Sequence, residues 1–151
     1  MLVKLALSPF GYWLDRQVVR WFGASWINYV TARAFGYRPG QQRVVLLVTR
    51  GRKSGRRRAA VLPVFEIDGR RVVVGSKGGA PADPGWVHNL RHDPAVEFFV
   101  ERRRKRGRAR ESQGNERAVL WAELTRRVPL YADYQARAGR QIPVVVLEEA
   151  G

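Results

Sequence analysis

Continuous apolar runs, separated by short polar turns, predict a sheet over much of this chain. Val44 to Val48 and Ile142 to Leu147 are apolar at every position, a pattern typical of strands that are buried on both faces. Ala59 to Ile67 has the composition of another strand. Within it, Pro63 favours a sheet edge or a bulge, because proline donates no ladder hydrogen bond.

Two turns extend the predicted sheet into hairpins. Asp68 and Gly69 are a two-residue hairpin signal that leads into a strand from Arg70 to Gly75. Ala95 to Val100 reads as a further strand, and it is followed by Arg102 to Arg110, which carries seven Lys or Arg. This basic segment is either a hairpin into another strand that ends at Glu111 or a solvated basic hairpin.

Apolar residues at helical spacing predict four helices, which are grouped rather than alternating with strands. Phe10 to Tyr29 is amphipathic, and Asn115 to Val128 starts with a residue type that caps helices. A short helix opens at Pro84-Gly85-Trp86, and Leu130 to Ala138 follows the break at Pro129. Hairpin-linked strands with grouped helices predict an α+β domain around a mostly antiparallel sheet or barrel.

The first predicted helix supports two interpretations. Its three tryptophans stand among arginines. It either packs on the domain or on a partner subunit, or it lies in a membrane interface, as aromatic and basic residues do on monotopic helices. A turn-rich linker, Gly36 to Gln42, follows it. We expect residues 1–40 to form this helix and linker, and residues 41–151 to form the sheet domain.

Length and composition narrow the class of protein. At 151 residues and 45% hydrophobic, the chain is sized for one domain with a substantial core. Its 28 Lys and Arg against 13 Asp and Glu give a formal net charge of +15, which predicts an anionic partner or surface. The sequence has no cysteine, no signal-peptide pattern and no apolar run of the ~18 residues that a membrane span needs. We expect a cytoplasmic protein.

Two loops supply the candidate chemistry. Thr49 to Arg58 holds six Lys or Arg and two glycines at a strand end, where backbone N–H groups and guanidinium groups can meet phosphate or carboxylate oxygens. Ser76 to Trp86 is rich in glycine, which lets backbone approach a flat ligand. Trp86 and Asn89 add stacking and hydrogen bonding. Together the loops predict one large, partly aromatic, anionic cofactor.

Other kinds of site find little support. His88 and His92 have a spacing that can ligate zinc, but no third ligand accompanies them. No carboxylate pair frames a cleft, the serines lack a GxSxG setting, and GRKSG lacks the Walker spacing. Nucleic acid is the main non-enzymatic alternative, because the two basic clusters hold six and seven of the Lys and Arg. No nucleic-acid-binding motif is present, so we expect no such partner.

Four blocks of the chain, between Val44 and Glu148, resemble the deazaflavin-dependent nitroreductase and F420H2-dependent quinone reductase family. The blocks are LLVTRGRKSGRRR, with LPV after it; VVVGSKGGAPADPGWVHNLRHDPAVE; RARE, with ER and LW after it; and YADYQARAGRQIPVVVLE. The resemblance implies a split β-barrel. It also implies hydride transfer from reduced coenzyme F420 to a quinone, nitro-aromatic or related acceptor.

The same resemblance implies roles for individual residues. F420 carries a phosphodiester and a glutamate tail, so its negative end would lie on the basic loop, its length along the following strand, and its ring on the glycine-rich loop and short helix. The implied cofactor-binding residues are Arg52, Lys53, Ser54, Arg58, Ala59, Ala60, Val61, Leu62, Pro63, Val74, Gly75, Ser76, Lys77, Gly85, Trp86, Val87, His88, Asn89 and Tyr131. Tyr131 and Tyr134 would also line the acceptor side, where phenol hydroxyls hydrogen-bond an oxygen or donate a proton, and Ser76 is the third catalytic candidate.

Alternatives to this interpretation remain. An FMN-dependent reductase on the same fold would need a shorter anionic site, and a non-catalytic binder of F420 or nucleic acid is the other alternative. Arg50 stands where the family usually has a small hydroxyl residue, and Val128 where some members have tyrosine, which leaves the acceptor open. We expect a monomer or homodimer, and we hypothesise peripheral attachment to the inner face of the cell membrane through the first helix.

Overall fold

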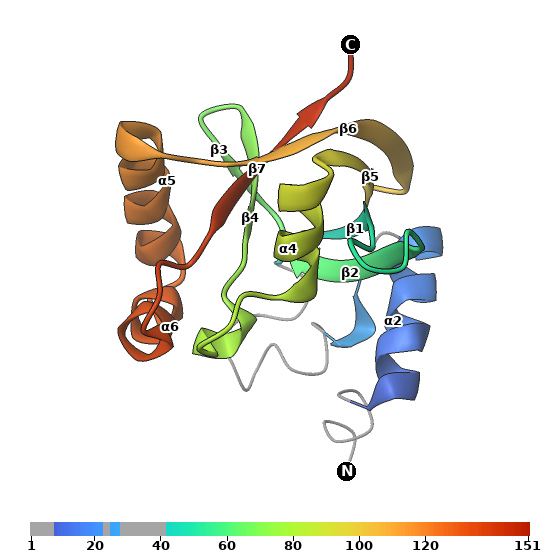
Figure 1. Cartoon of the computed structure of the whole chain (residues 1–151), viewed down its shortest axis with the longest axis horizontal. Helices are drawn as coiled ribbons and strands as arrows, with labels where there is room; N and C mark the ends of the chain where they lie inside the picture. The colour runs from blue at the N-terminus through green and yellow to red at the C-terminus, as the bar shows by residue number, and fades with distance from the viewer. Residues whose placement is uncertain (1–7, 23–24, 28–41) are drawn as a thin grey trace.

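The computed structural model describes residues 8–22, 25–27 and 42–151, and its centre is one seven-stranded sheet. Every pair of neighbouring strands is antiparallel, in the order β2-β1-β5-β6-β7-β4-β3. The strands are β1 (Val44–Arg50), β2 (Arg57–Pro63), β3 (Phe65–Ile67), β4 (Arg70–Val74), β5 (Ala95–Val100), β6 (Arg103–Glu111) and β7 (Val144–Glu149). Figure 1 shows the sheet curling into a half-barrel. The predicted α+β split barrel is confirmed.

One residue between two strands accounts for the curl. The strand predicted from Ala59 to Ile67 is in fact two strands, because Val64 interrupts it and donates its N–H to the carbonyl of Arg43 at 3.0 Å. β2 lies at one edge of the sheet and β3 at the other. Since only Val64 separates them, the two edges must approach each other, and β2 indeed contacts β4. Pro63 ends an edge strand, as its ring requires.

The strands β1 and β7 are apolar at successive positions because each is covered on both faces, by the barrel interior and by helices. Along β1, Val45 and Leu47 face the barrel interior, while Val44 and Leu46 face α2 (Pro9–Phe22). Along β7, Val145 and Leu147 face the barrel interior. Val144 and Val146 face the helices α5 (Gly114–Arg127) and α6 (Leu130–Ala138). Because side chains alternate along a strand, both alternating sets must be apolar. The prediction that these two strands are buried on both faces is confirmed.

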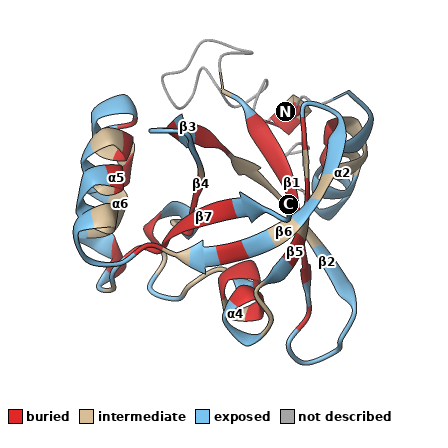
Figure 2. Cartoon of the chain, turned by 90° about the horizontal axis from the view of Figure 1, so that it is seen from above, coloured by how far each residue is buried: buried red, intermediate tan, exposed pale blue. Residues whose placement is uncertain are grey.

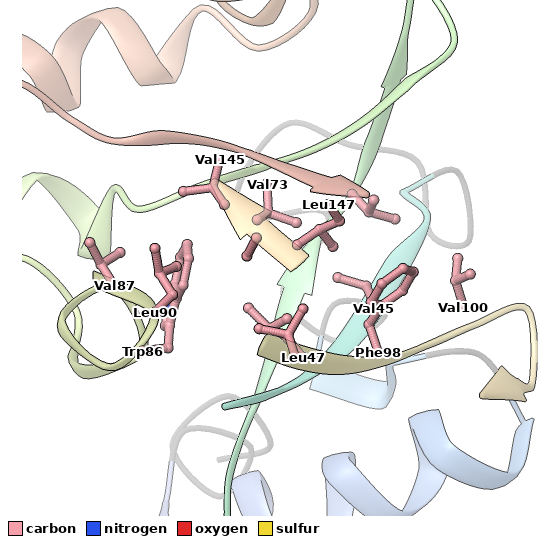
Figure 3. Packing of buried hydrophobic residues seen from close by; sticks show 13 residues of the cluster. Val45, Leu47, Val73, Trp86, Val87, Leu90, Phe98, Val100, Val145 and Leu147 are labelled. Carbon is pink, nitrogen blue, oxygen red and sulfur yellow. The ribbon is translucent and has the colours of Figure 1, made fainter. Parts of the chain in front are cut away.

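The helices form separate layers around the half-barrel. Figure 1 shows α5 and α6 on one side, α2 on the opposite side, and α4 (Gly85–His92) between them in front of β1 and β2. Seen from above, the buried positions of α4 and α5 face the sheet (Figure 2). Figure 3 shows Trp86, Val87 and Leu90 of α4 directed into the interior that Leu47, Phe98 and Val145 share. Helix α4 therefore closes one end of the barrel, beside the β1–β2 hairpin.

The first helix is shorter than predicted. It ends at Phe22, Ser25 lies outside it, and Tyr29 and most of the predicted linker lie outside the described residues. The buried carboxylate of Asp15 accepts hydrogen bonds from the Ser25 hydroxyl at 2.8 Å and the Ile27 N–H at 3.0 Å. Residues 25–27 therefore lie back against α2 instead of extending it. Burial raises the pKa of Asp15 despite these hydrogen bonds.

Other boundaries shift by one or two residues. The predicted cap at Asn115 is wrong: α5 begins at Gly114, whose φ of 55° suits glycine, and Gln113 precedes it. The final strand begins at Val144 rather than at Ile142. The turn at Asp68 and Gly69 is confirmed, with both φ angles positive as this hairpin type requires. The basic segment after β5 is the further strand β6, ending at Glu111 as predicted.

Candidate functional site

The basic β1–β2 hairpin and the start of α4 enclose a pocket of about 370 Å³. The hairpin, at residues 51–56, joins two strands whose register pairs Arg50 with Arg57. Nine residues that the sequence assigned to the cofactor line the pocket together with Gly51: Arg52, Lys53, Ser54, Arg58, Ala59, Ala60, Gly85, Trp86 and Asn89. The structure therefore brings together the predicted anion-binding residues and the predicted aromatic and amide groups.

The hairpin loop has a shape that depends on glycine. The Gly51 N–H donates to the Arg56 carbonyl at 2.7 Å, and the Gly55 N–H donates to the Gly51 carbonyl at 2.8 Å. A Cβ at Gly51 would lie 2.7 Å from the Ser54 hydroxyl oxygen. Gly55 has a φ of 68°, a left-handed conformation that glycine adopts without strain. These contacts keep the loop tight and leave its cationic side chains outside.

Asn89 fastens the loop to α4. Its buried amide oxygen accepts the Arg52 N–H at 3.1 Å, and its amide nitrogen donates to the Thr49 hydroxyl at 3.0 Å. Both ends of the side chain are thus used inside the protein. The structure adds a positioning role for Asn89, because it holds the backbone of the basic loop against the pocket.

The pocket concentrates positive charge. Among the described residues, Arg52, Lys53 and Arg58 form no ion pair, and all three are exposed. Their neighbour Arg50 points elsewhere, with its Nε 3.6 Å from an Asp93 carboxylate oxygen. Three unneutralised cations around one hollow favour an anionic ligand, and guanidinium groups suit phosphate and carboxylate oxygens in particular.

Several of the residues expected around the cofactor ring are fixed in position because they pack against the hydrophobic core. Val74 and Gly75 are buried, and the Gly75 N–H donates to the Pro143 carbonyl at 2.9 Å. A Cβ at Gly75 would lie 2.9 Å from a methyl group of Val87, which is itself fully buried. Trp86 belongs to the same interior cluster and also lines the pocket. Val87 is therefore a core residue, whereas Trp86 serves both the core and the pocket wall.

Arg140 is a positioning residue that sequence reasoning missed. Its guanidinium donates to three carbonyls of the glycine-rich loop, those of Gly75 (3.3 Å), Ser76 (3.1 Å) and Ala80 (3.0 Å), and to the Asp83 carboxylate at 2.5 Å. The signal was present in the ARAGRQ segment, where an arginine follows the left-handed Gly139 that ends α6. Nothing in the sequence alone joins it to a loop some 60 residues earlier.

The two candidate tyrosines lie apart from the basic pocket, and the lining of that pocket includes neither of them. Tyr131 is buried, with its ring 6.1 Å from Phe65 and 6.3 Å from Tyr134. The α6 helix that carries them packs on the 3-10 turn η2 (Lys77–Gly79), where Gly79 lies against the Tyr134 backbone. Ser76 is half-buried just before this turn, and Lys77 is exposed in it. The tyrosines therefore neighbour the loop assigned to the cofactor ring.

The remaining predicted residues have less direct positions. Val61 packs toward α2, Leu62 toward the barrel interior, and Pro63 ends β2 beyond the pocket. His88 is half-buried on α4. Within residues 8–22, 25–27 and 42–151, no group of His, Cys, Asp and Glu side chains is arranged to hold a metal ion. In the same residues no helix is long and apolar enough to span a bilayer.

The fold and the pocket define a split-barrel protein with a cationic pocket beside an aromatic wall. The family model described as F420H(2)-dependent quinone reductase matches residues 25–149. The chain belongs to this family. It is therefore an F420-dependent oxidoreductase, which confirms the expected cofactor class and enzyme class.

Individual relatives agree with the family assignment. The F420H(2)-dependent quinone reductase Rv1261c of Mycobacterium tuberculosis is 36% identical over 143 residues, which cover 89% of this chain and 95% of that protein. The solved F420-H2 dependent reductase FDR-A is 37% identical with a TM-score of 0.62, covering 70% of this chain and 93% of that one. A second solved chain, described as a domain-swapped dimer, is 33% identical with a TM-score of 0.64, covering 82% and 97%.

Proposed function

We propose that this protein binds reduced coenzyme F420 in the pocket between the β1–β2 hairpin and α4 and uses it to reduce a quinone. The observation that carries the placement is the group of three cations, Arg52, Lys53 and Arg58, which form no ion pair among the described residues. The phosphodiester and carboxylates of F420 match such a group in charge and in hydrogen-bonding geometry.

The described residues fit this cofactor in three respects. The basic loop offers guanidinium, ammonium and hydroxyl groups to its anionic end. The small side chains of Ala59 and Ala60 leave room along β2, and Trp86 offers an aromatic wall. Arg140 donates to the Ser76 carbonyl and so holds the glycine-rich loop, which is proposed to border the ring. Val74, Gly75, Lys77 and His88 are proposed to border that ring.

The acceptor is proposed to lie near η2 and α6. Reduced F420, when bound, supplies a hydride, and a quinone that takes this hydride also needs one proton to become a hydroquinone. The phenols of Tyr131 and Tyr134 are the proposed groups for orienting the acceptor oxygen and for handling that proton, with the Ser76 hydroxyl as the third candidate. A nitro-aromatic acceptor is the second candidate, since its oxygens would meet the same donors.

Assembly and location complete the proposal. Of the two expected states, monomer and homodimer, we propose the homodimer. Its support is the relative described as a domain-swapped dimer. Peripheral contact of α2 with the inner face of the cell membrane, in a cytoplasmic protein, would give access to membrane quinones. The support for that contact is the set of exposed aromatic residues on α2.

A turnover assay tests the acceptor side. Purified protein with F420H2 is offered a soluble quinone or a nitro-aromatic compound, and oxidation of F420H2 is followed by absorbance. We expect faster turnover with the quinone, and a lower kcat for Tyr134→Phe and for Ser76→Ala with little change in the affinity for F420. Tyr12→Phe is the matched control, since Tyr12 is an exposed residue of α2. Unchanged kcat in both site variants would contradict the proposed acceptor position.

A further inference from the structure

Helix α2 presents an aromatic ridge to solvent. Phe10, Trp13 and Trp21 are 61%, 50% and 66% exposed, and the Phe10 and Trp13 rings stack with centroids 6.0 Å apart. At 100° per residue these three side chains lie opposite the buried positions of the helix. The ridge is therefore not the face that packs on the sheet. Large exposed aromatic residues gathered in this way mark an interaction surface.

A basic groove runs beside this ridge, between α2 and the strands β1, β2 and β5. Its volume is about 550 Å³. Five arginines line it, around an apolar floor of Leu46, Val48 and Phe99: Arg16, Arg20, Arg57, Arg58 and Arg104. The guanidinium of Arg20 lies over the Phe99 ring, 5.9 Å from its centroid. The groove thus combines cationic walls with an apolar base.

The positive charge of the groove is mostly unneutralised. Glu97 is the acidic partner of Arg57 and Arg104, at 2.6 and 2.7 Å. Within the described part of the chain, Arg16, Arg20 and Arg58 form no ion pair. One carboxylate among five guanidinium groups leaves the groove cationic, so charge complementarity favours an anionic occupant.

We propose that this groove binds the phosphate of an anionic phospholipid while the aromatic ridge lies in the bilayer interface. The proposal deepens the peripheral contact proposed above by naming its lipid class. An amphiphile matches both features at once, since its phosphate meets the arginines and its acyl glycerol part meets the apolar floor and the rings. A purely polar anion, such as the glutamate tail of F420, would use the arginines but not the ridge.

The position of the groove connects the membrane to the cofactor site. The groove and the F420 pocket share Arg58 and Ala59 as lining residues. A lipid phosphate held by Arg16 and Arg20 would therefore place the cofactor pocket beside the bilayer surface. A lipid-soluble quinone would then need to travel only a short way from the bilayer to the protein.

Vesicle co-sedimentation of the full chain tests this site. Vesicles of phosphatidylcholine alone are compared with vesicles that also contain phosphatidylglycerol. We expect preferential binding to the anionic vesicles, and a loss of about 30-fold in that binding for the double variant Arg16→Gln, Arg20→Gln, because each basic residue near an anionic surface contributes a several-fold factor. The double variant Arg126→Gln, Arg137→Gln removes the same charge from exposed positions on α5 and α6, and it should bind like wild type.

Three outcomes decide the matter. Equal binding to both kinds of vesicle, or equal losses in the two double variants, would overturn the proposal. A weaker affinity of Arg16→Gln, Arg20→Gln for F420 without vesicles would assign the groove to the cofactor tail and would also overturn it. Circular dichroism checks that each variant is folded. Failure of the proposed function would look different, because F420 would not bind while the preference for anionic vesicles persisted.

Discussion

Two arginine-rich regions of this protein look alike in sequence and differ in structure. Around the pocket proposed for F420, Arg52, Lys53 and Arg58 form no ion pair among the described residues. Along β6, four of the cations, Arg104, Lys105, Arg106 and Arg110, are paired with carboxylates. The pairs include Arg104 with Glu97 at 2.7 Å and Arg110 with Glu116 at 2.7 Å and with Glu148 at 2.6 Å.

The difference distinguishes the proposed binding region from a surface of paired charges. Paired surface charges gain little net energy and attract few further anions, whereas unpaired cations around a hollow keep their full attraction for a ligand. The side-chain hydrogen bonds from Arg110 lower the pKa of Glu116, and those from Arg104 lower the pKa of Glu97. Changes of charge near the pocket should therefore alter F420 binding, whereas changes of charge along β6 should leave it unchanged.

The largest effect is expected on stability, from a substitution at Gly107, where the backbones of β6 and β7 lie in close contact. A Cβ at Gly107 of β6 would lie 1.8 Å from the Glu148 carbonyl oxygen of β7, so Gly107→Ala should force the two strands apart. We expect a loss of about 3 kcal/mol or more in the free energy of unfolding, measured by urea denaturation. Gly85→Ala is the control, because no atom lies within 4 Å of its Cβ position. Equal stabilities would show that β6 and β7 are not packed as described.

A smaller effect is expected at the loop beside the pocket. Arg140→Met removes the donor that Gly75, Ser76 and Ala80 share and leaves the half-buried Asp83 with Arg91 alone. We expect a loss of about 2 kcal/mol in the free energy of unfolding. We also expect a clear fall in kcat/KM for F420H2, since the loop would no longer be held. Arg140→Lys should restore only part of both. A kcat/KM for F420H2 equal to that of wild type in Arg140→Met would show that the glycine-rich loop is not part of the cofactor site.

The two regions can be compared directly by replacing one lysine in each and measuring the affinity for F420. Lys53→Gln should weaken F420 binding about tenfold, in line with the loss of one charge-assisted contact of about 1.4 kcal/mol. Lys105→Gln on the β6 face, where Lys105 pairs with Glu149, should leave the affinity unchanged. Fluorescence titration measures both. If both variants lose affinity equally, net charge rather than the pocket attracts the cofactor.

The smallest effect concerns pH and the paired glutamates. Hydrogen bonds from Arg126 and then Arg127 lower the pKa of Glu123 to about 2. Because the folded pKa lies below the unfolded one, this pairing stabilises the fold above about pH 4.5, and the contribution is lost as the pH falls toward 2. Unfolding measured across this range should show a weaker acid dependence in Glu123→Gln. Asp15 acts in the opposite direction, since burial raises its pKa.

The sequence predicted the parts of the fold that depend on local pattern. Val44–Val48 and the Asp68-Gly69 turn could be found because a continuous apolar run and turn chemistry involve only near neighbours. The interruption at Val64 could not be found, since a single apolar residue looks the same inside a strand and between two strands. It is the partner at Arg43 that separates β2 from β3.

The site was predictable to a similar degree. The basic loop and Trp86 stood out by composition, and they do line one pocket. The positioning roles of Asn89 and Arg140 depend on partners 37 to 65 residues away, and no pattern within a short window contains them. The pairing of charges on β6 is likewise visible only when β7 and α5 lie beside it.

Titration of the purified protein with oxidised F420 and, in parallel, with FMN at low and high salt tests the central claim most directly. The account predicts tight binding of F420 that weakens as salt rises, because unpaired cations hold its anionic end, and much weaker binding of FMN. Preference for FMN, or F420 binding that is insensitive to salt, would contradict the assignment of the pocket between the β1–β2 hairpin and α4.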